Sequence, residues 1–338
     1  MLPFIRNTTY KKWAFILGLV AILMAAAPLG AHAKQLSVVA SIKPIHSLVA
    51  GVMGDQGTLS LLLDSALDPH IFSMKSSDIR KVINADILFY VDPELETFLS
   101  SIVSQKHYKL HAVRLAAQED ILLLPYRTSK VWFSEEQASD QAGNRDHTNP
   151  QAAQEAMDLH IWLHPANARR IVTIIEETLS RHDPDNRLTY IRNAKLLIKR
   201  LYDLEERVRD QLRPMREKPL IVYHDAIQYF ERAFNLKSVG AIQLKSDAPP
   251  SVKHLRALRK IAREKNVACV LGAPGSHPRI ATVVMGDTQA GYDVIDPLGL
   301  YLDPGPELYF ELIEEISLTL QQCQPVDSDL FDIDPQMD

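Results

Sequence analysis

Residues 219–242 read PLIVYHDAIQYFERAFNLKSVGAI. The apolar run over 220–223, with β-branched Ile221 and Val222, predicts a strand, the stretch 225–234 predicts a helix, and 237–242 predicts a second strand. A strand, a helix and a strand in quick succession are typical of a parallel sheet covered by helices. This stretch therefore predicts an α/β fold.

The same alternation occurs on both sides of this stretch. A chain of 338 residues is longer than the roughly 250–300 residues at which single cores stop growing, so two lobes are expected. Each lobe should contain a parallel sheet covered by helices. The remaining strands are expected over 36–41, 58–63, 87–91, 267–271 and 292–295, and the helices over 44–53, 76–84, from Glu94, 251–265 and 306–321.

Residues 1–33 have the features of a secretory signal peptide. Three basic residues precede an apolar run of 12 residues over 13–24, and AHA, ending at Ala33, is a small-x-small cleavage site. A membrane anchor is the alternative, although Pro28 and Gly30 interrupt the uncharged stretch. We expect cleavage after Ala33 and export to a periplasm or to the medium. Removing three basic residues changes the formal charge from −5 to −8, which argues against nucleic acid as a partner.

The two cysteines of the chain are Cys269 and Cys323. No cysteine precedes them, so none is available to lipidate the mature N-terminus. Neither has a CxxC or Cys/His partner at metal or redox spacing, and the compartment is oxidising. We therefore expect them to form a structural disulfide.

Two segments differ from the alternation, one between the lobes and one within the first lobe. Residues 185–213 have apolar residues at helical spacing, no Gly or Pro inside, and a proline on each side. This pattern predicts one long helix, which either links the two lobes or lies on the surface of one of them. Residues 126–157 have no periodic apolar face and are rich in polar and acidic residues, so we interpret them as a mobile acidic loop. The expected division is a first lobe over 34–184, a linker helix over 185–213 and a second lobe over 214–338.

Three histidines lie where parallel-sheet proteins bind ligands, in loops or at the carboxyl ends of strands. His70 follows a strand and a loop, His160 follows the acidic loop, and His224 directly follows LIVY. Three neutral imidazoles suit zinc and leave one coordination position open. For each histidine alone a hydrogen-bonded structural role is the alternative. The chain has no GxGxxG after a strand, GxxxxGK[ST], HExxH or GxSxG motif, so nucleotide binding and common hydrolase mechanisms lack support.

Asp296 ends the predicted strand YDVI and is a candidate fourth ligand; the alternative is a turn-forming aspartate before proline. His164 lies four residues after His160, but Pro165 begins the next helix, which favours His164 as its N-cap. His46 and His254 are interpreted as packing or surface residues on helices. His107, His111, His182 and His277 have no partner at ligand spacing in the sequence.

Five stretches together resemble the zinc branch of the metal-binding receptors of ABC uptake transporters. They are VVASIKPIHSLVAGVMGD, DPHIFSMKSSDIRKVINADILFYVDPELETFL, DLHIWLHPANARRI, IVYHDAIQYFERAFNL and VIDPLG, and they span the mature chain. The resemblance implies a two-lobe receptor joined by one rigid helix, with metal held by His70, His160 and His224. It also implies a disulfide at the Cys269 and Cys323 positions.

Two departures limit the resemblance. Zinc receptors of this type often carry a long His-rich acidic loop, whereas residues 126–157 keep only His147, and residues 272–276 read GAPGS where relatives often have AEPQF. Manganese-binding relatives tend to have a glutamate at the position of His224, and three imidazoles suit zinc better.

The sequence therefore predicts a soluble, monomeric periplasmic receptor that is not an enzyme. It would bind Zn²⁺ and deliver it to an ABC permease and its ATPase. The alternatives are a manganese or iron receptor on the same scaffold, and a secreted zinc hydrolase with Asp225 or Asp296 as base.

Overall fold

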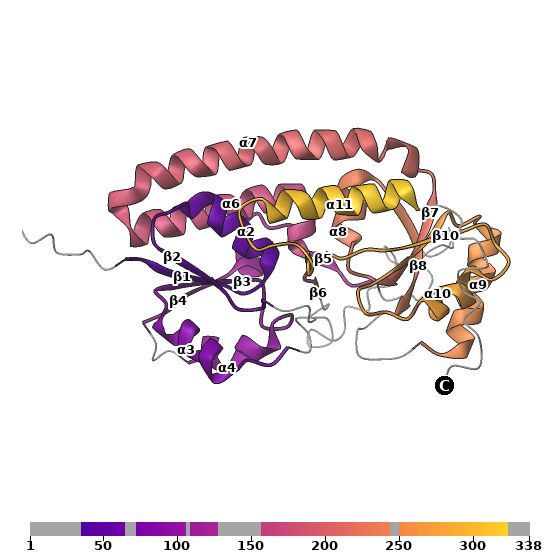
Figure 1. Ribbon diagram of the computed structural model, residues 1–338, viewed down its shortest axis with the longest axis horizontal. Helices are drawn as coiled ribbons and strands as arrows, with labels where there is room; N and C mark the ends of the chain where they lie inside the picture. The colour runs from indigo at the N-terminus through magenta and orange to yellow at the C-terminus, as the bar shows by residue number, and fades with distance from the viewer. Residues whose placement is uncertain (1–34, 65–71, 106–108, 128–156, 244–249, 324–338) are drawn as a thin grey trace, which may run out of the picture. The chain divides into compact units, whose positions relative to one another are not determined.

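The computed structural model describes residues 35–64, 72–105, 109–127, 157–243, 250–323 (Figure 1). The expected signal peptide, His70 and nearly all of the acidic loop lie outside the described residues. Within them, no helix is both long enough and apolar enough to cross a membrane.

The first lobe is built on a four-stranded sheet in the order β2-β1-β3-β4, and all its neighbouring strands are parallel. The α/β prediction is confirmed, but β4 was missed because only its two central residues are apolar. The predicted helix from Glu94 is wrong in extent, since a 3-10 turn at Thr97–Leu99 precedes the single helical turn α4. The elements are β1 (Ser37–Ala40), α2 (Lys43–Met53), β2 (Thr58–Leu61), α3 (Ser76–Asn84), β3 (Ile87–Tyr90), α4 (Ser100–Val103) and β4 (His111–Arg114).

The second lobe is built on a parallel sheet in the order β10-β9-β7-β8. Its strands match the predicted ones within two residues, whereas α8 begins three residues later than expected. The short helix α10 was not predicted. The elements are β7 (Pro219–His224), α8 (Gln228–Phe234), β8 (Lys237–Gln243), α9 (Val252–Glu264), β9 (Cys269–Gly272), α10 (Pro278–Met285), β10 (Gly291–Val294) and α11 (Leu308–Gln322).

Helices α6 (Pro165–His182) and α7 (Arg187–Gln211) connect the two sheets. The predicted long helix is confirmed as α7, which has 25 residues and is flanked by 3-10 turns at Pro184–Asn186 and Arg213–Met215. It packs against α2 and α6 beside the first sheet and against α11, which follows the second sheet (Figure 1). Contacts on both sides favour a linker helix over a surface helix of one lobe.

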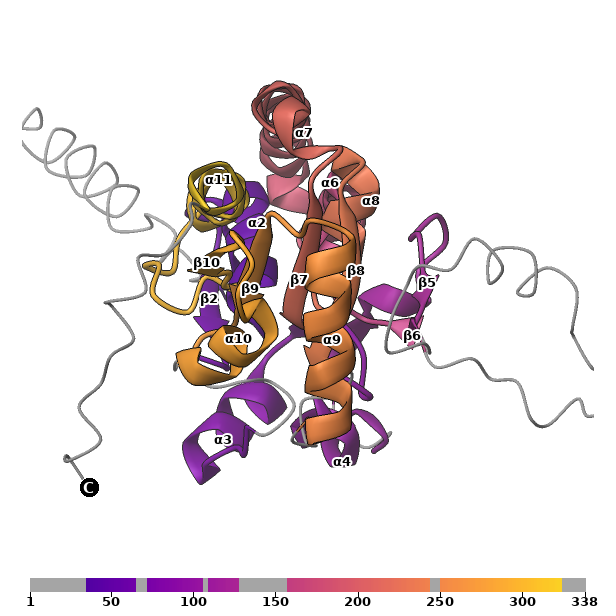
Figure 2. The ribbon, with the colours of Figure 1, turned by 90° about the vertical axis from the view of Figure 1, so that its right-hand side faces the viewer.

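The hydrophobic core is continuous between the lobes. One cluster of buried residues contains Val38 and Phe89 from the first sheet, Leu220 and Leu271 from the second, and residues of α2, α6, α7 and α11. A separate cluster lies under α3 and α4 on the other face of the first sheet. Helices α9 and α10 cover the corresponding face of the second sheet (Figure 2). Because apolar surface is shared, separating the lobes would expose it to water.

Two further connections shape the region between the sheets. The short strands β5 (Leu124–Pro125) and β6 (Met157–Asp158) pair antiparallel, so Pro125 and Met157 are neighbours although they are distant in the sequence. A disulfide joins Cys269 in β9 to Cys323 after α11, with a Cα–Cα distance of 6.1 Å. The predicted bridge is confirmed.

Candidate metal site

His224 is the last residue of β7, the strand at the centre of the second sheet beside β9 and β8. Leu220, Ile221 and Val222 before it are buried between helices on both faces, which fixes the strand end in space. His224 as a whole is partly buried, and both of its imidazole nitrogens are buried. It thus lies at the carboxyl end of a parallel strand, the place where open α/β sheets bind ligands.

His160 follows β6 and is held by Asp158, two residues earlier. Asp158 Oδ1 accepts a hydrogen bond from the His160 backbone N–H at 3.0 Å and lies 2.7 Å from the imidazole Nδ1. Both side chains are buried. With Nδ1 as the donor to this carboxylate, the lone pair lies on Nε2, the arrangement in which carboxylate-bound histidines bind metals.

The fold brings these two imidazoles together although 64 positions separate them in the sequence. The ring centroids of His160 and His224 are 5.5 Å apart, with an angle of 66° between the ring planes. Two imidazoles that share one tetrahedral zinc, with Zn–N bonds of about 2.0–2.1 Å, have ring centres roughly 5 Å apart. The observed spacing fits that arrangement.

His70 lies outside the described residues, so its distance to this pair is not defined. Among the residues that are described, no group of three or more His, Cys, Asp or Glu side chains is arranged to hold a metal ion. The three-histidine ligand set therefore stays a prediction.

Asp296 follows β10 and forms the turn that the sequence offered as its alternative role. Its Oδ1 accepts hydrogen bonds from the N–H groups of Leu298 and Gly299, and Oδ2 accepts one from Leu300. Gly299 has φ 66°, a left-handed conformation that glycine adopts without steric cost. The same loop is tied to the first lobe, because the buried Lys43 ammonium donates to the carbonyls of Leu300 and Leu302 at 2.8 Å each. Asp296 as a fourth ligand stays a prediction.

The other histidines divide into structural roles. His164 is the N-cap of α6, its Nδ1 accepting the N–H of Ala166 at 3.2 Å, as predicted. His254 lies on α9 with Nε2 2.8 Å from the Ala241 carbonyl, which confirms a packing role. Burial lowers the pKa of His46, which lies on α2, below its ordinary value.

One histidine prediction is incomplete. His111 and His182 have no partner at ligand spacing in the sequence, yet their rings lie 4.7 Å apart in the fold. His111 begins β4 and His182 ends α6, elements that are far apart along the chain. A spacing rule along the sequence does not detect such a pair.

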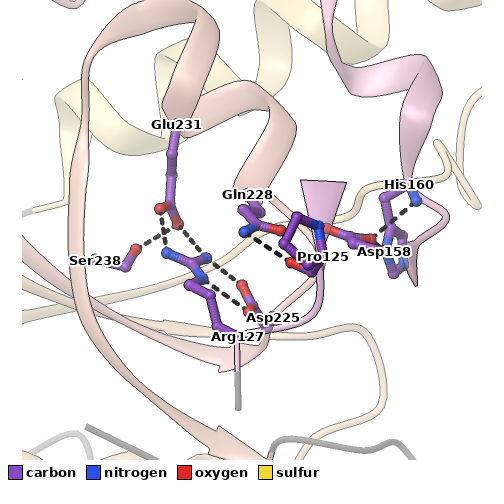
Figure 3. A network of polar contacts seen from close by, with 8 residues as sticks. All are labelled: Pro125, Arg127, Asp158, His160, Asp225, Gln228, Glu231 and Ser238. Atoms are coloured by element: carbon purple, nitrogen blue, oxygen red, sulfur yellow. Dashed lines mark hydrogen bonds and ion pairs between the residues drawn. The ribbon is translucent and has the colours of Figure 1, made fainter. Parts of the chain in front are cut away.

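A buried charge network that was not predicted includes Asp225, the residue directly after His224 in the sequence (Figure 3). Arg127, three residues after the start of β5, donates through Nε to Asp225 Oδ2 at 2.8 Å and through a second guanidinium nitrogen to Asp225 Oδ1. It also donates to Glu231 Oε2 at 2.8 Å. Ser238 Oγ donates to Glu231 Oε1 at 2.6 Å.

The network decides the state of Asp225. Burial raises the pKa of its carboxyl to about 6, and the Arg127 guanidinium opposes that shift. Asp225 is therefore ionised at neutral pH and already bound by a cation. Its carboxylate oxygens face Arg127, which argues against Asp225 as the base of a zinc hydrolase.

Tyr229 of α8 joins the two lobes at the same place. Its hydroxyl donates to the Asp158 carbonyl at 2.7 Å and accepts the Leu124 N–H at 2.9 Å. The phenol thus closes the end of the β5–β6 ladder that precedes His160. The sequence signal for Asp158 was its position two residues before a candidate ligand; Arg127 and Tyr229 carried no local signal.

Solved structures of other proteins share this fold. Crystal structures of a ZnuA and of a Zn(II)-bound variant of AdcAII from Streptococcus pneumoniae have TM-scores of 0.67 and 0.66. Each is 22% identical in sequence; they cover 86% and 85% of this chain, and 99% of each of those chains is covered. The fold class predicted from the sequence, two parallel-sheet lobes joined by a long helix, is confirmed.

The sequence comparisons define the family. The family described as zinc-uptake complex component A, periplasmic, matches residues 38–323. The high-affinity zinc uptake system protein ZnuA of Brucella abortus is 32% identical over 305 residues, which are 85% of this chain and 91% of that protein. The protein of the same name from Paracoccus denitrificans is 30% identical over 326 residues, 91% of this chain and 97% of its own. The chain therefore belongs to the family of periplasmic zinc-uptake components.

Proposed function

We propose that this protein captures Zn²⁺ in the periplasm and delivers it to an ABC permease and its ATPase. The observation that carries the proposal is the meeting of His160 and His224, which come from different lobes, at a spacing that one zinc ion can bridge. Membership of the zinc-uptake family supports the same conclusion.

In this proposal His70, His160 and His224 bind the metal, and Asp296 or water fills the fourth position. Imidazole nitrogens suit zinc, whereas manganese and iron receptors benefit from more carboxylate oxygens. Capture and release of zinc form and break only metal–ligand coordination bonds and change no covalent bond. The protein is therefore a receptor and not an enzyme. It acts as a monomer after signal-peptide cleavage at Ala33.

The shared core limits how the lobes move. Release of zinc requires His160 and His224 to move apart, while α7 and the buried cluster common to both sheets resist a large opening. We expect a modest tilt or a local displacement of loops during transfer to the permease.

The test is metal analysis of the exported protein, followed by competitive titration with a chromophoric zinc chelator. The wild type should hold one tight zinc per chain. His70→Ala, His160→Ala and His224→Ala should each lose tight binding. His277→Asn is the matched control, because His277 is an exposed N-cap of α10 and asparagine can also cap a helix.

Three results would contradict the proposal or part of it. Wild-type protein without tight zinc would remove the receptor function, and tight zinc in all three histidine variants would remove the ligand set. Tighter binding of manganese than of zinc would favour the alternative receptor.

A further inference from the structure

The backbone of Arg127 lies in the first lobe, and its side chain contacts residues of the second lobe. Its main chain follows β5, which pairs with β6 just before His160. Its guanidinium contacts Asp225 and Glu231, both in the second lobe (Figure 3). The ion pairs therefore cross between the lobes at the candidate metal site.

The two carboxylates depend on this cation. The side chains of Asp225 and Glu231 are only 3% and 6% exposed, and the negative charge of Glu231 opposes ionisation of Asp225. Burying two like charges is unfavourable unless a cation compensates them. The planar guanidinium donates through Nε–H and a terminal N–H to Asp225 and through its terminal N–H groups to Glu231, a geometry that a point charge cannot reproduce.

The network is linked to both candidate ligands through the backbone that runs from His224 into α8. Asp225 is the residue after His224, and the Ala226 N–H bonds to the His224 carbonyl at 2.8 Å in the turn that leads to α8. From α8, Tyr229 reaches Asp158, and Asp158 holds the imidazole of His160. Gln228 Nε2 also donates to the Pro125 carbonyl at 3.3 Å, beside Arg127.

We propose that Arg127 is a positioning residue of the zinc site. It fixes the turn after His224 against the β5–β6 ladder, so the ligands from the two lobes are held near their bound separation before metal arrives. A site ordered during folding loses less entropy on binding and releases metal more slowly. The inference rests on the proposed zinc function and adds to it a residue that does not contact the metal.

The experiment compares zinc binding and dissociation in wild type, Arg127→Ala and Arg127→Lys. Loss of a residue that orients a metal ligand typically lowers affinity about 10–100-fold, and we expect Arg127→Ala to fall in that range. The change should appear mainly in the zinc dissociation rate after addition of excess chelator. Arg127→Lys keeps the positive charge but lacks the planar set of guanidinium donors. Its zinc affinity should therefore lie between those of wild type and Arg127→Ala.

Arg207→Ala is the matched control. Arg207 on α7 forms an ion pair with Glu314 of α11 at 2.7 Å, and both side chains are about half exposed. Arg207→Ala also removes one arginine–carboxylate pair between segments distant in sequence. Neither Arg207 nor Glu314 belongs to the network of Arg127. We expect zinc affinity within about twofold of wild type, since exposed pairs contribute little.

A lowered melting temperature in Arg127→Ala with zinc affinity and dissociation rate within twofold of wild type would overturn the inference, because Arg127 would then only stabilise the fold. If Arg127→Ala does not fold, Arg127→Lys decides by the same criterion. The proposed function fails by a different result: wild-type protein would then hold no tight zinc, whatever the Arg127 variants do.

Discussion

Removal of the Cys269–Cys323 disulfide should destabilise the second lobe strongly. The bridge spans 54 positions, from a fully buried strand residue to the end of α11. In the chain-entropy model, a cross-link that closes a loop of this length stabilises the fold by about 4 kcal/mol near room temperature. The effect arises because the bridged chain has fewer unfolded conformations.

The perturbation should be the double variant Cys269→Ala/Cys323→Ala. Alanine is preferable to serine because Cys269 is buried, and a buried hydroxyl without a partner would add its own cost. Urea unfolding of the zinc-free protein, followed by circular dichroism, gives the free energy of unfolding and its slope. The slope should increase, since the unbridged unfolded chain exposes more surface.

The control is wild-type protein measured with and without reductant. Reduced wild type should resemble the double variant, while the variant itself should not respond to reductant. A loss of less than about 1 kcal/mol with an unchanged slope would refute the chain-entropy reasoning. Two free thiols in unreduced, denatured wild type would refute the bridge itself.

Three further predictions concern pH and metal. Burial raises the pKa of Glu96 to about 7 from its ordinary value of 4.5. Between these pH values the folded protein binds more protons at Glu96 than the unfolded protein, so the free energy of unfolding decreases as pH rises. In wild type, the free energy of unfolding measured with urea should decrease on the order of 3 kcal/mol from pH 5 to pH 7.5, and Glu96→Gln should abolish this decrease. An equal decrease in wild type and in Glu96→Gln would contradict the prediction. His224→Glu should weaken zinc binding and narrow the gap to manganese without inverting it, and competitive titrations that show unchanged zinc affinity would remove His224 from the site. Zinc affinity should fall steeply between pH 7.5 and 5.5, because imidazole binds metal only when deprotonated; a constant affinity over that range would argue against histidine ligands.

Local pattern accounts for much of the fold. The run 220–223 lies between apolar layers and became the central strand β7, and the periodic stretch 185–213 became α7. The prediction failed where local signals were weak or absent. Strand β4 has only two apolar residues, and α8 begins only at Gln228, whereas Asp225, the predicted helix start, lies before the helix and binds Arg127.

The sequence by itself determined the α/β class, the disulfide and the candidate ligands His160 and His224, because strand periodicity, cysteine number and strand-end position are local properties. Only the tertiary structure decided which distant residues meet. It placed the two imidazoles 5.5 Å apart, tied Asp296 into its own turn, and brought Arg127 to two buried carboxylates. These contacts depend on the packing of both lobes around one core, where burial makes an unpaired charge costly and so selects its partner.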